Sequence, residues 1–143
     1  PGSMAVIRPG QTELAAQLRD AGCHIVESIE AEAGMGSALA HAVRATRGAE
    51  GWLVALADMP WVPGGAIRAV ASAIDTPKRI AAAAFDGRRG HPVAFGAHWA
   101  SQLVALRGDS GARDLLRTAD VRLIEAGTVD VLRDIDHPAD LAG

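Results

Sequence analysis

Short apolar segments alternate with segments of helical periodicity along the chain. In residues 11–21, apolar side chains recur every three or four positions, which predicts a helix that ends at Gly22. Residues 52–57 are apolar without alternation, the pattern of a strand buried on both faces, and we expect them to form a central strand. The other expected strands are 5–8, 24–26, 79–85, 92–95, 121–125 and 129–135, and the other expected helices are 37–46, 63–74, 97–106, 110–118 and one starting at 138.

Strands that alternate with helices indicate βαβ units and therefore an α/β fold with a mainly parallel, three-layer sheet. In such sheets, ligands bind beyond the carboxyl ends of the strands. The loops after Val26, Ala57 and Phe85 are therefore expected to carry function. Neither of the common phosphate-binding patterns, GxGxxG and GxxxxGK[ST], occurs in the chain.

The length of 143 residues corresponds to one domain, and 49% hydrophobic residues provide a core. A net charge of −3 and an aromatic content of 3% argue against nucleic-acid binding. The single cysteine, Cys23, excludes an intrachain disulfide and favours the cytoplasm, and no apolar run is long enough to cross a membrane. Residues 1–3 before Met4 have the form of an expression-tag remnant, so we assign the domain to residues 4–143.

Three acidic residues follow expected strands. Asp58 comes directly after the apolar segment 52–57, and Asp134 and Asp136 share one face of the last expected strand because strand side chains alternate. Carboxylates at strand ends suit Mg²⁺ carried by a nucleotide. A turn aspartate at position 58, and helix-capping acids before Pro138, are the structural alternatives.

Two further motifs could contact phosphate or a polar substrate. Gly34-Met35-Gly36-Ser37 opens a helix and offers backbone N–H groups and a hydroxyl, although a glycine turn with a serine N-cap would look the same. Arg89-Gly90-His91-Pro92 belongs to a small basic patch, which could also be a solvated hairpin turn. The segment 108–113 is expected to cap a helix, with Arg113 as a candidate anion contact.

Five motifs in this order resemble the molybdenum cofactor cytidylyltransferase branch of the MobA-like NTP transferases. They lie at residues 34–39 (GMGSAL), 56–60 (LADMP), 89–96 (RGHPVAFG), 108–113 (GDSGAR) and 134–141 (DIDHPADL). Each motif is modest, but the ordered set is specific, and the resemblance spans roughly residues 6–141.

This resemblance implies a Rossmann-like fold and a bacterial enzyme that transfers a nucleoside monophosphate, CMP from CTP, to the terminal phosphate of molybdopterin with release of pyrophosphate. It implies Asp58 as the principal Mg²⁺ ligand, completed by Asp136 and Asp134. Residues 34–37 would approach the nucleotide, and residues 89–92 would line the acceptor side. A molybdoenzyme of the xanthine dehydrogenase type is the implied protein partner.

The sequence departs from the family pattern at two places. His137 replaces the usual threonine, and the family's opening strand and glycine-rich loop, LAAGxSxRMGxxK, have no counterpart before Met4. We therefore expect a sheet that lacks its first strand, weak or absent catalysis by this chain alone, and an open strand edge that can pair with a second copy. The alternatives are transfer from GTP, transfer to another phosphate acceptor, and a non-catalytic domain that binds the cofactor or a partner.

Overall fold

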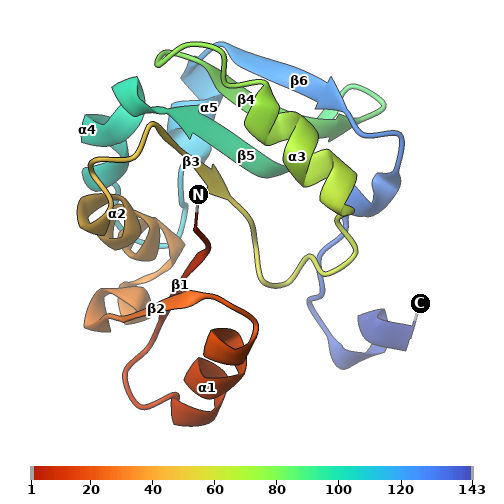
Figure 1. Cartoon of the computed structure of the whole chain (residues 1–143). Coiled ribbons are helices and arrows are strands. Elements are labelled where there is room, and N and C mark those ends of the chain that lie inside the picture. The colour runs from red at the N-terminus through yellow and green to blue at the C-terminus, as the bar shows by residue number, and fades with distance from the viewer. Residues whose placement is uncertain (1, 143) are drawn as a thin grey trace. The chain divides into compact units, whose positions relative to one another are not determined.

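The computed structural model describes residues 2–142, which form two compact units (Figure 1). Unit 1 consists of residues up to 48 together with 100–118, and unit 2 of residues 49–99 together with those from 119 onward. Pro1, in the expected tag remnant, and Gly143, the last residue of the expected domain, lie outside the described residues. The assignment of residues 4–143 to one domain stays a prediction.

Unit 1 begins with a β-α-β step in which the two strands are parallel neighbours, with Met4 opposite His24 and Ile7 opposite Glu27. Helix α2 packs against β1 and α4 and buries Ala40 and Val43 completely. The elements of unit 1 are β1 (Met4–Ile7), α1 (Thr12–Asp20), β2 (His24–Glu27), the 3₁₀ helix η1 (Ile29–Ala33), α2 (Met35–Ala45), α4 (Ala100–Val104) and α5 (Arg113–Thr118).

Unit 2 is built on a four-stranded sheet in the order β3-β5-β4-β6, in which β4 and β6 are parallel and β5 runs antiparallel to both of its neighbours. Helix α3 lies on one face of this sheet (Figure 1). The elements are β3 (Gly51–Val54), α3 (Gly64–Ser72), β4 (Ile80–Phe85), β5 (Arg88–Gly96), β6 (Val121–Glu125) and the 3₁₀ helices η2 (Ala97–Trp99), η3 (Val129–Leu132) and η4 (Pro138–Ala142).

The core of unit 2 consists of small side chains. Ala81 and Ala83 on β4 are fully buried together with Val70 of α3 and Val131 of η3. Because alanine projects only one methyl group from the sheet, a helix can approach the strands closely, and even a small core is then densely packed. The alanine-rich composition therefore brings α3 and η3 close to the sheet that carries the candidate site.

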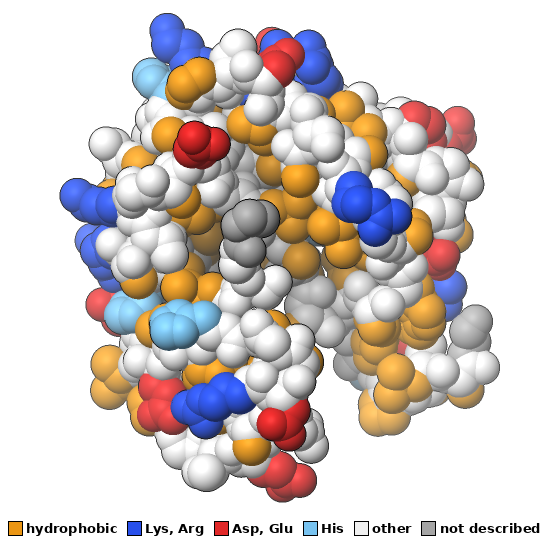
Figure 2. Space-filling model, viewed as in Figure 1, with side chains coloured by type: hydrophobic (Ala, Val, Ile, Leu, Met, Phe, Trp, Pro, Cys, Tyr) orange, Lys and Arg blue, Asp and Glu red, His pale blue; other side chains and the backbone are white. Residues whose placement is uncertain are grey.

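Charged side chains of both signs are interspersed on the face shown in Figure 2, as a small net charge leads one to expect. Among the helices of residues 2–142, none combines the length and apolar character that crossing a lipid bilayer requires.

The α/β class is confirmed, but two local expectations are wrong and one strand is longer than expected. Residues 52–57 are not a central strand, since β3 ends at Val54 and lies at the edge of its sheet. Residues 129–135 are not a strand, because the Thr128 side chain accepts a hydrogen bond from the Asp130 N–H (3.2 Å) and begins the 3₁₀ helix η3. The strand expected at 92–95 is present but longer, since β5 begins at Arg88, where Asp86 and Gly87, both with positive φ, join β4 to β5 in a tight hairpin.

That hairpin also explains the mixed sheet. A two-residue connection can only join antiparallel strands, so β5 enters between β3 and β4 in the opposite direction to both. The parallel pairings are β1 with β2 in unit 1 and β4 with β6 in unit 2. The alternation of strands and helices along the sequence does not predict that β5 runs antiparallel to its neighbours.

Candidate active site

His91 of unit 2 lies in the field of two of the predicted acids. Its burial, followed by the positive charge of Arg89, lowers the pKa of His91, and the carboxylates of Asp58 and Asp134 act in the opposite direction. These influences link three predicted residues from three separate motifs, His91, Asp58 and Asp134, through their charges. The direct structural link among the three motifs is the backbone hydrogen bond between residues 58 and 135, which joins the Asp58 loop to the segment that carries Asp134.

An irregularity in β5 directs His91 toward this position. Ala82 pairs with Val93, but Ala84 pairs with Arg89, so residues 90–92 of β5 all lie opposite Ala83 alone. Such a bulge bends the strand and changes the direction of its side chains, and it is frequent next to active sites. The basic motif at residues 89–92 therefore coincides with a strand bulge, and this bulge positions the side chain of His91.

Gly90 brings Asp134 close to the bulge. A Cβ atom on Gly90 would lie 2.0 Å from the carbonyl oxygen of Val131 in η3, so only glycine allows η3 to pack this closely on β5. The chain runs from η3 directly into residues 133–136. Gly90 and Pro92 are themselves buried, so they shape the site and offer no side chain to a substrate, whereas Arg89 is exposed.

The loop that carries Asp58 is bound to the same segment. The N–H of Ile135 donates to the carbonyl oxygen of Asp58 at 2.8 Å, and the side chains of Asp58 and Asp134 remain exposed. Asp136 is also exposed, and Asp140 accepts hydrogen bonds from the backbone N–H groups of Asp136 (3.0 Å) and His137 (2.8 Å) at the start of η4.

The three predicted acids do not form a complete metal-binding group. Among residues 2–142, no three His, Cys, Asp or Glu side chains are close enough together to hold a metal ion. Magnesium bound together with a nucleotide needs only one or two carboxylates, because the phosphates and water provide the other ligands. Asp58 and Asp134 supply that number, so the donor set fits an ion carried by a nucleotide. Ligation by Asp136 stays a prediction.

In unit 1, residues 34–37 are engaged with the loop that begins at Gly108. The Gly36 N–H donates to the Gly108 carbonyl at 2.7 Å, and the Ser37 hydroxyl oxygen accepts from the Gly108 N–H at 3.1 Å. A Cβ on Gly34, whose φ is +118°, would lie 2.1 Å from the Asp109 carboxylate. Two of the groups expected to face a nucleotide are therefore used within the protein. Met35 is half-exposed, and contact of this segment with a nucleotide stays a prediction.

Sequence reasoning missed this pairing of loops. Residues 108–113 were expected to cap a helix, with Arg113 as a candidate anion contact, whereas α5 begins at Arg113 and the preceding loop packs against residues 34–36. The only sequence signal is the glycine content of both segments, since glycine permits close approach of two backbones.

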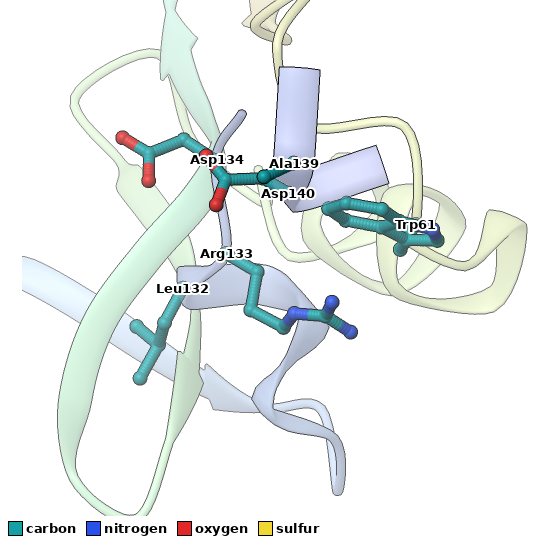
Figure 3. Close-up of a pocket in the computed structure, with 6 residues that line it drawn as sticks. All are labelled: Trp61, Leu132, Arg133, Asp134, Ala139 and Asp140. Carbon is teal, nitrogen blue, oxygen red and sulfur yellow. The ribbon is translucent and has the colours of Figure 1, made fainter. Parts of the chain in front are cut away.

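Sequence reasoning also missed Trp61 and Arg133, which line a pocket of about 420 Å³ in unit 2 (Figure 3). The guanidinium carbon of Arg133 lies 4.2 Å from the ring centroid of Trp61. The remaining residues of this pocket are Leu132, Asp134, Ala139 and Asp140. The available signal was proximity in sequence, because Trp61 follows Asp58 by three positions and Arg133 precedes Asp134.

The lowered pKa of His91 predicts a pH dependence of stability. The unfolded chain binds a proton at this histidine near pH 6.5, and the folded chain does so only at lower pH. The contribution of His91 to stability is therefore complete above pH 6.5 and falls as the pH is lowered through that value. We expect the free energy of unfolding of the wild type to fall more steeply between pH 7.5 and 5.5 than that of His91→Gln. Urea titrations at several pH values measure this, and parallel curves would contradict the expectation.

Comparison with known proteins agrees with the α/β fold described above. A family model described as the MobA-like NTP transferase domain matches residues 2–125. The chain belongs to this family. The MobA-like match includes Asp58 and His91 and ends before Asp134 and Asp136. The expectation that these two acids belong to the site rests on the motif resemblance, and their role stays a prediction.

One curated relative of this MobA-like chain is the purine catabolism protein PucB of Bacillus subtilis (strain 168), which is 31% identical over 114 residues. The match covers 76% of the chain and 55% of PucB, so the chain spans about half the length of this relative.

Solved structures share the fold. A nucleotidyl transferase from Methanothermobacter thermautotroptrophicus (Mth528) aligns with a TM-score of 0.81 at 21% identity over 99% of the chain and 70% of its own. Rv0371c of Mycobacterium tuberculosis H37Rv, solved as a complex with manganese, aligns with a TM-score of 0.75 at 21% identity over 99% of the chain and 76% of its own. At these identities the likeness establishes the MobA-like nucleotidyltransferase fold.

Proposed function

We propose that the protein containing this chain transfers CMP from CTP to the terminal phosphate of molybdopterin and releases pyrophosphate. The observation that carries the proposal is the hydrogen bond that joins the Asp58 loop to the segment carrying Asp134, in a chain of the MobA-like NTP transferase family. The choice of CTP and of molybdopterin rests on the five ordered motifs. Mg²⁺ is the proposed ion, and the manganese complex of Rv0371c supports a divalent metal.

In the proposed reaction, an oxygen of the acceptor phosphate forms a bond to the α-phosphorus of CTP. The bond between that phosphorus and the α,β-bridging oxygen breaks, and the electron pair leaves with pyrophosphate. A phosphate monoester is already largely ionised at neutral pH, since its second pKa is about 6, so the protein need not remove a proton from it. The main task of the protein is then to align the two substrates.

Each side chain of the site has a role that follows from its surroundings. The exposed carboxylates of Asp58 and Asp134 would hold the divalent ion, which, when bound, neutralises charge on the phosphates. The exposed guanidinium of Arg89 provides a permanent positive charge for the acceptor phosphate. His91, neutral at pH 7 because its pKa is lowered, can donate one ring N–H to a phosphate oxygen.

The test uses the natural protein that contains this chain. It is incubated with Mg²⁺, molybdopterin and CTP or GTP labelled at the α-phosphate, and the label in the dinucleotide product is counted. We expect label from CTP, at a rate about tenfold or more above that from GTP, a discrimination typical of a binding site for one base. Transfer from GTP alone would overturn the base assignment. Molybdopterin binding with no transfer from either nucleotide would favour a binding protein.

A protein partner is also proposed. The name of PucB places that relative in purine catabolism, and a molybdoenzyme of the xanthine dehydrogenase type acts on a purine. We therefore propose such an enzyme as the recipient of the finished cofactor. Copurification of the two proteins from one cell extract would support this proposal. The control is an extract of cells in which the recipient is deleted, where the protein should be recovered alone.

A further inference from the structure

Residues 133–136 carry a stacked contact on the side opposite to Asp134. Arg133 has an extended backbone (φ −96°, ψ 122°), in which successive side chains point in opposite directions. Figure 3 shows the Arg133 side chain directed away from that of Asp134 and toward Trp61. With 4.2 Å between the guanidinium carbon and the ring centroid, this is a cation–π contact. It joins the segment that carries Asp134 to the loop that carries Asp58.

The same loop has a second attachment to this segment, the 2.8 Å hydrogen bond from the Ile135 N–H to the Asp58 carbonyl. A loop held at one hydrogen bond can still rotate about it, whereas a second contact three residues further on fixes its orientation. Arg133 is in turn held by Asp130 at 3.1 Å, and Asp130 accepts a hydrogen bond from the Thr128 hydroxyl at 2.8 Å. The stack thus rests on a chain of contacts anchored in η3.

We propose that Arg133 is a positioning residue, which through Trp61 holds the Asp58 carboxylate in the orientation, relative to Asp134, that binds a nucleotide-borne divalent ion. This inference rests on the proposed function, because it assumes that Asp58 contributes to such an ion. Arg133 itself touches neither the ion nor the nucleotide in this scheme. Its effect is pre-organisation, since a carboxylate that is already oriented loses less entropy on binding.

The first measurement is the affinity for Mn²⁺ in the presence of CTP, followed by the electron paramagnetic resonance signal of free Mn²⁺. Arg133→Met keeps a long stem that can cover Trp61 but lacks the charge, and we expect it to weaken binding about tenfold, as loss of a supporting contact does at metal sites. Arg133→Lys keeps the cation and should restore most of the affinity. Arg122→Met is the matched control, because it removes an exposed Arg–Asp pair of the same unit, to Asp75 at 3.3 Å.

A second measurement needs no metal and no nucleotide. The Ile135 amide donates a hydrogen bond to the Asp58 carbonyl, so we expect it to be protected from hydrogen exchange. If the stack orients the loop, Arg133→Met should increase the exchange rate of this amide about fivefold, the size expected for loss of one exposed cation–π contact. Trp61→Leu removes the ring and keeps Arg133, and it should reproduce both effects. This second variant also serves if Arg133→Met fails to fold.

The outcomes separate the inference from the proposed function. Unchanged Mn²⁺ affinity in Arg133→Met and Trp61→Leu, together with loss of binding in Asp58→Asn, would overturn the positioning role and leave the proposed function intact. Weakened binding with unchanged exchange at Ile135 would also overturn it, because Arg133 would then act on the ligand directly. Full binding in Asp58→Asn would remove the proposed metal site and the inference with it.

Discussion

Replacing Asp58 by asparagine is expected to weaken the binding of Mn²⁺ with CTP by about 100-fold and to abolish CMP transfer, since a carboxylate ligand contributes both charge and coordination to such an ion. Asparagine has nearly the same size, and the Asp58 side chain is exposed. The hydrogen bond from Ile135 is made to the backbone carbonyl of residue 58, which the substitution leaves in place. The free energy of unfolding should therefore stay within about 0.5 kcal/mol of the wild type.

The matched control is Asp86→Asn, which makes the same change in charge at the turn between β4 and β5. Asp86 has a φ of 52°, a conformation that asparagine tolerates well, so this variant should fold and bind Mn²⁺ with CTP like the wild type. Titration of the Mn²⁺ signal and the labelled-CTP assay compare the two variants directly. Equal affinities in Asp58→Asn and Asp86→Asn would show that residue 58 is an ordinary turn aspartate.

Replacing Gly90 by alanine is expected to lower the free energy of unfolding by about 3 kcal/mol, at the upper end of the range for overpacked sites. The added Cβ would lie 2.0 Å from the carbonyl oxygen and 2.8 Å from the carbonyl carbon of Val131. Both are backbone atoms, so a side-chain rotation cannot relieve the clash. Helix η3 has to move away from β5, which exposes the fully buried Val131.

This variant should also weaken Mn²⁺ binding, because residues 133–136 follow η3 directly and move with it. Urea denaturation followed by circular dichroism measures the stability. Gly65→Ala is the control, since Gly65 lies in α3 with no atom within 4 Å of an added Cβ, and alanine favours a helix by about 1 kcal/mol. A loss below 1 kcal/mol in Gly90→Ala would mean that η3 is not held against β5 as described.

Much of the secondary structure could be predicted from the sequence. The strand at 121–125 has the expected bounds, and α2 and α3 agree with expectation within about two residues at each end. Residues 129–135 could not be predicted in this way, because their β-branched composition favours a strand, and a hydrogen bond from the Asp130 N–H to the Thr128 side chain decides otherwise. The direction of β5 likewise could not be predicted. It depends on two turn residues, which hydrophobic periodicity does not identify.

The candidate site was predicted in part. Asp58 and Asp134 were identified because acids at strand ends have a known chemistry, and His91 because it belongs to a basic motif. Their proximity to one another could not be read from the chain, since 43 positions separate His91 from Asp134 in the sequence. The packing contacts of Gly90 and Gly36 were missed for a related reason. The sequence alone does not distinguish a glycine needed for close packing from a glycine that faces a phosphate.

The sequence by itself determined the alternation of strands and helices, the family, and the identity of the acids and the histidine. These depend on local periodicity and on the chemistry of single side chains, both of which a linear pattern contains. Only the tertiary structure decided that residues 90–92 bulge to place His91, that η3 brings Asp134 to the bulge, and that Arg133 stacks on Trp61. Each of these arrangements depends on contacts between residues far apart in the chain. A local sequence pattern does not contain the energies of such contacts, so it cannot predict them.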